Sequence, residues 1–326
     1  MLIKFLKYTA ISLISILLIA MVLPYLIPLG QKKFSPEEKP FFNSKFLDVE
    51  GIRLHYRTFI PASEPKAYIL LIHGFSGSTF SWRKNDQIFC DSGYYVLSVD
   101  LPSFGFSEKE KNNFDHGAAA QADKCARIIK KEGLINKNWI AMGHSMGANT
   151  AWHFALQYNK SCSKLFLVDG AAALRSNTKR SPWVVFWSYV ASFPPFQAWI
   201  ECIAVYQFFN EKKFTELLSS AYGEKPNISS VRGYLRPFLY RKSAQSIIQG
   251  FLYPQEEYNI NLNQMRSDVY MIWGTEDRWV PLEAAQKFIK SYPLARLYQI
   301  QGTGHCPMET KAREFNQIIL EQLNKE

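Results

Sequence analysis

The chain has 326 residues, of which 47% are hydrophobic and 20% charged, and its formal net charge is +10. This composition is typical of a folded globular protein and excludes an extended disordered one. The charge does not indicate a nucleic-acid partner, because the Lys and Arg residues are scattered and form no basic run interleaved with aromatic residues. A basic face that meets an anionic membrane surface accounts for the charge more simply.

The cysteines indicate neither a metal site nor a redox site, and we expect no metal and no cofactor. Their number is odd and they show no CxxC spacing. We expect them to be small buried residues of the core. They are Cys90, Cys125, Cys162, Cys202 and Cys306.

The amino terminus predicts a membrane anchor. Residues 8–31 carry no charge and are mostly Ile, Leu, Val and Ala, with Lys4 and Lys7 before them and Lys32 and Lys33 after them. A helix of about 20 residues crosses a bilayer core of about 30 Å, so the segment is long enough to span. Residues 1–31 are therefore assigned to an anchor and residues 32–45, which are polar and contain proline, to a linker.

A cleaved secretory signal is the alternative to an anchor. Such a signal has a shorter apolar region and a cleavage site of small residues, whereas here the sequence Pro-Tyr-Leu-Ile-Pro occupies 24–28. We favour an uncleaved single-pass anchor. Lysines flank both sides almost equally, so they fix the orientation poorly; a short positive tail kept in the cytoplasm would place the rest of the chain on the extracytoplasmic side.

The first half of the chain reads as alternating strands and helices. Residues 46–51 and 53–59 alternate around Gly51 as in a hairpin. Short continuous apolar runs then predict buried parallel strands, and longer periodic segments predict the helices between them. The expected strands are 67–72, 94–99, 138–142 and 164–168, and the expected helices are about 117–132 and 146–158.

This rhythm stops at residues 171–255, which are rich in Trp, Phe and Tyr and have helical periodicity. It resumes with strands at 268–273 and 296–300 and a helix at about 282–291. A closing helix has an apolar face of Phe315, Ile318, Ile319 and Leu323. Strands alternating with helices predict an α/β fold with a parallel sheet covered on both faces. The core is assigned to 46–170 and 256–326, and 171–255 to an inserted helical cap.

A candidate nucleophile lies in the sequence Gly143-His144-Ser145-Met146-Gly147, directly after a predicted strand and at the start of a predicted helix. A strand–turn–helix setting holds a serine hydroxyl out of the sheet, where a base can activate it. Glycines on both sides let neighbouring backbone pass close by. The alternative is that Ser145 only caps the helix.

Four motifs together resemble the α/β-hydrolase family: Gly143–Gly147, the His-Gly-Phe sequence at 73–75, the segment 274–281 and the segment 302–310. The resemblance covers nearly everything from Phe46 to the carboxyl terminus except the cap. It implies a mostly parallel sheet of the eight-stranded type. It also implies a catalytic triad in the chain order serine, acid, histidine.

The resemblance assigns the triad to Ser145, Asp277 and His305. His305 would take the Ser145 proton and return it to the leaving group, while Asp277 fixes the ring and stabilises its charged form. Glu276 and Asp169 remain alternative acids. His144 is expected to be a packed neighbour of the serine turn.

The resemblance also assigns the oxyanion hole to two backbone N–H groups. One belongs to Met146, which follows the nucleophile, and the other to Phe75 in the loop after the strand 67–72. The Phe75 side chain is expected to form a pocket wall, and His73 to brace the loop. One departure from the family pattern is Ser103, which stands where glycine is usual in the turn after Asp100.

The aromatic cap predicts an apolar substrate. Trp183 and Trp187, together with Phe75, are expected to line an apolar pocket, although many cap aromatics are needed only for docking on the sheet. The cap also carries more Lys and Arg than Glu, which favours a basic surface resting on membrane lipid headgroups. The partners expected are thus a small apolar ester and a lipid surface.

The sequence therefore predicts a serine hydrolase that cleaves an apolar or lipid-like carboxylic ester through an acyl-serine intermediate. Epoxide hydrolases and haloalkane dehalogenases of the family carry Asp at the nucleophile position, where this chain has Ser145. Thioesterases, amidases, C–C bond hydrolases and acyltransferases share the triad and stay open. A catalytically silent binding module is the remote alternative.

Overall fold

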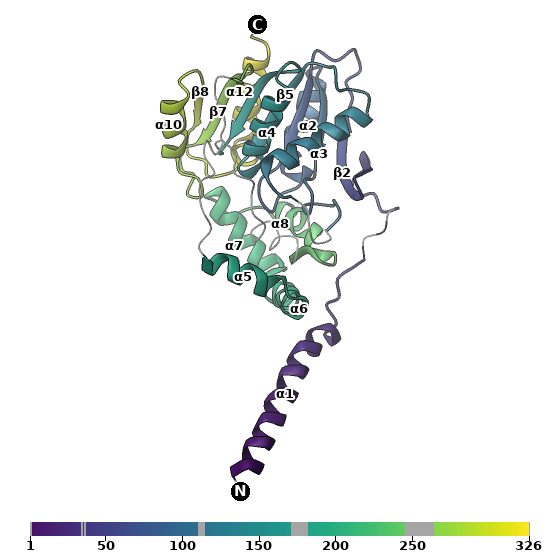
Figure 1. Cartoon of the computed structure of the whole chain (residues 1–326). Helices are drawn as coiled ribbons and strands as arrows, with labels where there is room; N and C mark the ends of the chain where they lie inside the picture. Colours follow the sequence, from purple (N-terminus) through teal and green to yellow (C-terminus); the bar gives the residue numbers. More distant parts are fainter. Residues whose placement is uncertain are drawn as a thin grey trace.

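A computed structural model of the chain describes residues 2–33, 35, 37–109, 115–170, 182–244 and 264–325 (Figure 1). Its centre is one eight-stranded sheet of order β1-β2-β4-β3-β5-β6-β7-β8. Strand β2 runs antiparallel to β1 and β4, and the other neighbours are parallel. The strands are β1 (Ser44–Val49), β2 (Ile52–Phe59), β3 (Tyr68–Ile72), β4 (Tyr95–Val99), β5 (Trp139–His144), β6 (Cys162–Val168), β7 (Asp268–Gly274) and β8 (Arg296–Ile300).

Both faces of the sheet are covered by helices. On one face lie α3 (Ala118–Lys131), α4 (Met146–Gln157) and α10 (Leu282–Ser291), and on the other α2 (Asp86–Asp91) and α12 (Ala312–Leu323). Strand β3 is apolar throughout because it is buried on both faces of the sheet. Leu70 and Ile72 pack in the core on one face, Ile69 and Leu71 pack in the core on the other face, and all four are 0% exposed. A strand buried on both sides loses the polar alternation of a half-exposed one.

The predicted strands and the α/β class are confirmed. The hairpin is present, with Gly51 at a φ of 79° in its turn, and the closing helix buries Phe315, Ile319 and Leu323. Shorter elements were not predicted, because one or two turns give too few periods to recognise. These are α2, η1 (Thr79–Trp82) and α11 (Pro307–Thr310).

An inserted helical layer lies between the sheet and the amino-terminal helix (Figure 1). It consists of α5 (Pro182–Ser192), α6 (Pro194–Ile203), η2 (Ala204–Phe208), α7 (Glu211–Tyr222), α8 (Ile228–Leu235) and η3 (Arg236–Leu239). These elements lie within the predicted cap 171–255. Its ends at 171–181 and 245–255, and the start of the second core segment at 256–263, fall outside the described residues.

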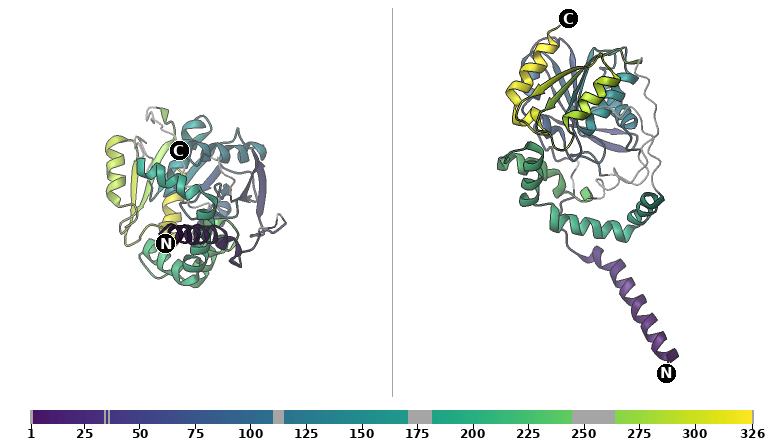
Figure 2. Two further views of the ribbon diagram at one scale, coloured as in Figure 1. Left: turned by 60° about the horizontal axis from the view of Figure 1, so that its bottom comes forward. Right: turned by 90° about the vertical axis from the view of Figure 1, so that its left-hand side faces the viewer.

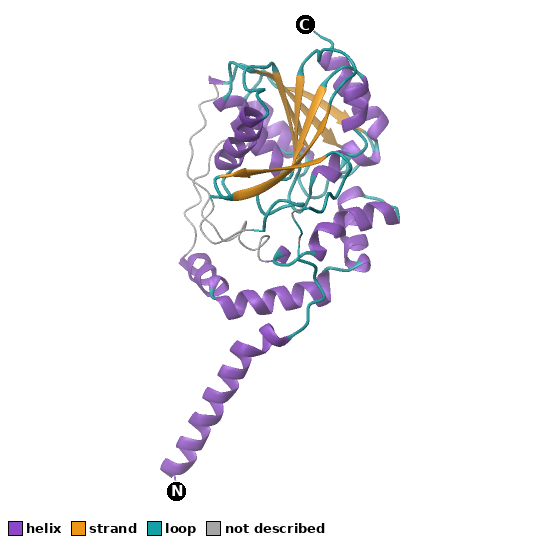
Figure 3. Cartoon of the chain, turned by 90° about the vertical axis from the view of Figure 1, so that its right-hand side faces the viewer, coloured by secondary structure: helices purple, strands orange, loops and turns teal. Residues whose placement is uncertain are grey.

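The amino-terminal helix α1 (Leu2–Leu26) is long and apolar enough to cross a membrane. It projects away from the rest of the chain, and among the described residues its contacts with the other elements lie near its carboxyl end (Figures 2 and 3). There the indole N–H of Trp199 on α6 donates to the Ala20 carbonyl at 2.8 Å. Beyond α1, Lys32 pairs with Tyr240, so the predicted linker 32–45 begins as a short bridge to the cap.

Candidate active site

Ser145 occupies a strained turn between β5 and α4. Its φ of 52° and ψ of −119° lie outside the regions that a serine normally adopts, and its N–H donates to the Val168 carbonyl at 2.8 Å. A Cβ on Gly143 would stand 2.1 Å from the Gly147 carbonyl oxygen, and one on Gly147 2.4 Å from that of His73. The two glycines are therefore required by close backbone packing, as the sequence pattern predicts.

His305 lies in the loop after β8 and reaches both Ser145 and Asp277. Its Nε2 is 2.9 Å from Ser145 Oγ, and its Nδ1 is 2.7 Å from Asp277 Oδ2. With Nδ1–H donating to the carboxylate, Nε2 is left to accept the serine proton. The His305 N–H donates to the Ala221 carbonyl at 2.7 Å, so cap helix α7 helps to hold the loop.

Asp277 is held by the turn after β7. Its Oδ1 accepts the backbone N–H groups of Trp279 at 2.8 Å and Val280 at 3.0 Å, which leaves Oδ2 for His305. Asp277 is buried, whereas the alternative acid Glu276 is exposed on the same turn. The carboxylate that contacts His305 is thus the one at the predicted position.

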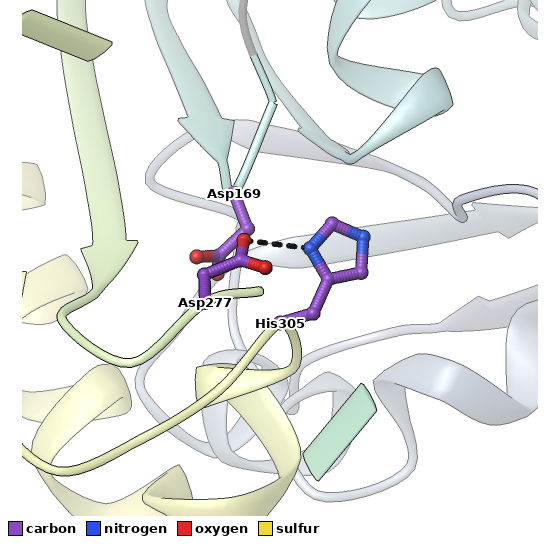
Figure 4. A group of neighbouring side chains, drawn as sticks. All are labelled: Asp169, Asp277 and His305. Atoms are coloured by element: carbon purple, nitrogen blue, oxygen red, sulfur yellow. Dashed lines mark hydrogen bonds and ion pairs between the residues drawn. The ribbon is translucent and has the colours of Figure 1, made fainter. Parts of the chain in front are cut away.

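A second carboxyl group, Asp169, lies beside this pair (Figure 4). It follows β6 with a φ of 43°, and its Oδ1 accepts the Gly274 N–H at 2.8 Å. Possible ligand atoms of Asp169, Asp277 and His305 lie within 4.8 Å of one another. Both ring nitrogens of His305 already bond to Ser145 and Asp277, however, so the group fits a proton relay better than a metal site.

The surroundings of Asp169 favour its protonated form. Burial, first, and the nearby charge of Asp277, second, raise the pKa of the Asp169 carboxyl well above its ordinary value. Asp277, whose Oδ2 bonds to His305 Nδ1, is thus the better placed of the two to carry the charge beside the ring. Its sequence position alone had left it as an alternative acid, and the hydrogen bonds assign it a supporting place instead.

Two further histidines fix the backbone around Ser145 and His305, and the side-chain hydrogen bonds described for them go to backbone groups. His144 is buried, with its Nε2 2.7 Å from the His305 carbonyl oxygen, to which it donates. Burial, and then the neighbouring His305, lower the His144 pKa well below its ordinary value, so its ring is neutral. His73 accepts the Leu101 N–H at 3.0 Å and contacts the Gly74 carbonyl at 2.7 Å, so it braces the loop as expected.

A cavity of about 230 Å³ opens at Ser145. Phe75 lies in its wall, as predicted, and Met146 is the first residue of α4, so its N–H has no partner inside that helix. The remaining wall is mostly apolar. The lining residues are Gly74, Phe75, Ser76, Gly77, Ser81, His144, Ser145, Phe214, Leu217, Leu218, Ala221, Tyr234, Trp279, His305 and Cys306.

The structure does not bring Trp183 and Trp187 into this cavity. They lie on α5 with 72% and 59% of their surface exposed. The cap contributes α7 instead, through Phe214, Leu217, Leu218 and Ala221. Their i, i+3, i+4, i+7 spacing is the signal that could have found them. Trp279 was also missed; its ring centroid lies 5.3 Å from that of His305.

A buried polar cluster attaches the cap to the core next to His305. Glu309 on α11 is 1% exposed and pairs with Arg83. The hydroxyl of Tyr222 donates to Glu309 at 2.6 Å, and Tyr234 bonds to it as well. Burial, first, and the Glu309 charge, second, raise the pKa of both tyrosines. Helices α7 and α8 are therefore tied to the short helix that follows the His305 loop.

A second serine–histidine–aspartate set lies elsewhere and is sealed. His55 bonds to Asp100 Oδ2 and to Ser44 Oγ, each at 2.7 Å, and none of the three is more than 4% exposed. Asp100 also accepts the N–H groups of Thr79 and Phe106. With no route for a substrate, this set braces the turn after β4.

Comparison with known proteins places the chain in a family. A family model described as the alpha/beta hydrolase fold matches residues 68–312. The chain is an α/β hydrolase. Among curated relatives, the uncharacterized hydrolase YugF of Bacillus subtilis is 27% identical to this hydrolase over 279 residues, covering 83% of this chain and 94% of its own.

Other relatives of the hydrolase have varied activities. A 2-hydroxy-6-oxononadienedioate/2-hydroxy-6-oxononatrienedioate hydrolase of Paraburkholderia phymatum is 25% identical over 297 residues, covering 86% of this chain and 96% of its own. A solved membrane phospholipase A, described as a bacterial virulence factor, superposes with a TM-score of 0.65 at 19% identity, over 98% of each chain. A putative lipase from Acinetobacter baumannii gives 0.65 at 19% identity, over 95% of each. These structures support the fold alone.

Proposed function

We propose that the hydrolase cleaves carboxylic esters through an acyl-Ser145 intermediate. The observation that carries the proposal is the continuous hydrogen-bonded relay from Ser145 Oγ through His305 to Asp277, at 2.9 and 2.7 Å. In the first step Oγ attacks the ester carbonyl while its proton moves to His305 Nε2. The protonated ring then gives that proton to the departing alkoxide, and Asp277 stabilises the charged ring meanwhile.

The second half of the reaction repeats this sequence with water. His305 takes a proton from the water, the resulting hydroxide attacks the acyl carbonyl, and the proton returns to Ser145 as the carboxylic acid leaves. In both halves the carbonyl oxygen becomes negative. We assign its stabilisation to the N–H groups of Met146 and Phe75, and such donors typically contribute about 3–4 kcal/mol each.

The cavity supports an apolar acyl or alkyl group as the bound part of the substrate. Phe75, Phe214, Leu217, Leu218 and Trp279 supply most of the wall. Apolar walls with a few polar groups at one end are typical of sites that bind small apolar ligands. The polar end here is the triad, so the ester carbonyl lies there and the apolar group extends beneath α7.

C–C bond hydrolysis is the second candidate, since relatives bear that activity in their names. The substrate named for the Paraburkholderia relative is a dicarboxylate, and a pocket for such a compound needs cationic side chains. Among the described residues that line the cavity there is no Lys or Arg. This favours an uncharged ester over a dicarboxylate. Thioesters, amides and acyl transfer would use the same relay.

We also propose that α1 anchors the hydrolase in a membrane as a single span, with the catalytic domain on the extracytoplasmic side. The length and apolar character of α1 support the span, and a membrane phospholipase A among the similar structures agrees with it. A lipid or lipid-like ester is then within reach of the enzyme. A mature amino terminus near residue 30, found by mass spectrometry, would argue for a cleaved signal instead.

The test of the ester proposal uses the full chain in detergent. A fluorophosphonate probe should label the wild type and fail to label Ser145→Ala. The rate at which each variant hydrolyses p-nitrophenyl esters of graded chain length should rise and fall with the extent of its labelling. Ser44→Ala is the matched control, because it belongs to the sealed set and should leave labelling intact. Wild-type protein that is folded but neither labelled nor active would favour the silent module.

A further inference from the structure

One outer face of the cap is almost free of charge. Between residues 182 and 210 the only charged residue is Glu201. Its side chain is turned inward, 4% exposed, and its Oε2 accepts the Ala244 N–H at 3.1 Å. The side chains that the structure describes on the surface of α5, α6 and η2 are therefore apolar or uncharged polar.

Many large apolar side chains of this segment face outward, and we call them the apolar face. Each of them is at least 41% exposed. Soluble proteins rarely expose so many large apolar groups side by side, and such surfaces mark sites of protein or membrane contact. The members are Trp183, Phe186, Trp187, Tyr189, Phe193, Phe196, Ile203, Tyr206 and Phe208.

The apolar face adjoins the helix that can cross a membrane. Besides the Trp199 bond to Ala20, Cys202 Sγ lies 3.5 Å from the Pro24 carbonyl oxygen, and the Tyr206 hydroxyl donates to the Pro28 carbonyl at 2.5 Å. Helix α6 runs across the carboxyl end of α1, and α5 packs against α6 (Figure 3). A bilayer that holds α1 therefore reaches α6 and η2 at its surface, with α5 packed against α6.

Exposed cations border the same region. Lys32 and Lys33 follow α1, and Arg241 lies beside them because its N–H donates to the Lys32 carbonyl at 3.1 Å. Lys212 and Lys213 lie in the first turn of α7 after Glu211, which pairs with Arg232, and Lys213 pairs with Glu216 at 2.7 Å. Aromatic groups flanked by Lys and Arg are typical of elements that lie in the interface of a membrane.

We propose that α5, α6 and η2 lie within the interface of the bilayer that α1 crosses, with the apolar face toward the acyl chains and the bordering cations on anionic phospholipid headgroups. This rests on the proposed membrane anchor and is independent of the ester chemistry. Helix α7 continues from this segment and lines the cavity with Phe214 and Leu217. The proposal thus brings the roof of the active site to the lipid surface.

The test places a fluorophore on the apolar face of the full chain in lipid nanodiscs. Tyr189→Cys is labelled with an environment-sensitive dye, and Leu294→Cys serves as the matched control. The two positions are 75% and 76% exposed, and Leu294 precedes β8 at the end of the sheet away from the cap. The native cysteines are all buried, so they should react little with the dye in the folded protein.

We expect emission from position 189 to shift to the blue and to be quenched by lipids with a nitroxide high on the acyl chain. Interfacial helices lie about 5–10 Å deep, so a nitroxide near the chain end should quench less. Position 294 should show neither effect. A higher fraction of anionic lipid should increase the extent of quenching at position 189, and added salt should reduce this increase.

Two results would overturn the proposal. Emission at 189 that is accessible to an aqueous quencher in nanodiscs would place the face in water. A blue shift without lipid quenching would assign it to a second copy of the chain. Phe196→Cys provides a second position should Tyr189→Cys fold poorly. Fluorophosphonate labelling of each variant keeps this test separate from that of the ester chemistry.

Discussion

The pair of carboxyl groups beside His305 gives the sharpest test of the proposed mechanism. Asp277→Asn and Asp169→Asn make the same chemical change at neighbouring positions. Asp277 carries the charge that accepts His305 Nδ1–H, whereas burial and the Asp277 charge raise the pKa of Asp169 and so favour its neutral form. We therefore expect very different losses from the two substitutions.

Asp277→Asn should lower kcat by about 10⁴-fold, by analogy with other triads, because the amide favours the wrong tautomer of the ring. That factor corresponds to about 5.5 kcal/mol of barrier. Asp169→Asn should change kcat little. In the wild type the Gly274 N–H donates to Asp169 Oδ1 at 2.8 Å, and the asparagine oxygen can accept the same bond. The asparagine NH₂ group can take the place of the protonated carboxyl oxygen.

The two variants should also differ in the pH dependence of stability. The folded-state pKa of Asp169 lies above its ordinary value of 3.8, so between those two values the folded state binds more protons than the unfolded state. The stability contributed by Asp169 is complete below pH 3.8 and falls as pH rises toward the folded-state pKa. An asparagine has no such loss. The unfolding free energy of Asp169→Asn minus that of the wild type should thus increase as the pH rises, by at most about 1.4 kcal/mol per pH unit.

The measurements are p-nitrophenyl ester turnover and urea unfolding of the full chain in detergent at pH 5 and pH 8. Wild type and Glu276→Gln, which alters an exposed neighbour, are the controls. A loss from Asp169→Asn as large as that from Asp277→Asn would refute the assignment of the acid. A stability difference between Asp169→Asn and wild type that is the same at both pH values would refute the neutral state of Asp169.

Three other substitutions test the cavity and its support. Glu309→Ala should cost about 3–5 kcal/mol of unfolding free energy, measured in urea, because it leaves the Arg83 charge without its buried partner; a loss near zero would show that the cluster does not hold the cap. Leu218→Trp should fill part of the cavity and shift the preferred p-nitrophenyl ester to shorter chains, whereas unchanged preference would place the acyl group elsewhere. Ser103→Gly should raise the melting temperature, because Ser103 has a φ of 70° at a cost of about 1–2 kcal/mol; an unchanged or lower value would contradict this.

The meeting of Ser145, His305 and Asp277 could be predicted from the sequence because each of them lies beside a recognisable local signal. Ser145 stands between glycines at a strand–helix junction, and Asp277 and His305 each follow a strand of the sheet. Strand ends gather at one edge of a parallel sheet, so order along the chain becomes proximity in space. Ser103 shows the converse: its positive φ explains why glycine is usual at this position, whereas the sequence alone shows only that Ser103 departs from the family pattern.

The rest of the site depends on contacts that no local pattern encodes. The bond network of Glu309 joins a loop, the core and two cap helices, and nothing around Glu309 or Arg83 in the sequence indicates the other. The aromatic content of a helix likewise indicates that it has an apolar face, but it does not indicate which part of the protein or its surroundings that face contacts. Trp183 and Trp187 were therefore expected in the cavity, whereas the structure leaves them on the outside of α5.

That separation of inner and outer apolar groups leads to a last prediction. Phe186 is 52% exposed on the apolar face. Burying a whole phenyl ring contributes roughly 3 kcal/mol of transfer free energy, so covering the exposed half with lipid would contribute about half of that. Phe186→Asp should then weaken the seating of the cap by at least about 1.5 kcal/mol, or roughly tenfold. We expect hydrolysis of an ester embedded in vesicles to fall by about that factor, with turnover of a short soluble ester unchanged.

Ile60→Asp is the control for this prediction, since Ile60 is 69% exposed but follows β2 in the core, away from the cap helices. It should affect neither substrate. Equal losses on both substrates from Phe186→Asp would mean that the ring supports the cavity from within. No loss on either would mean that lipid does not cover α5. Only a loss confined to the embedded ester joins the outer face of the cap to delivery of substrate to Ser145.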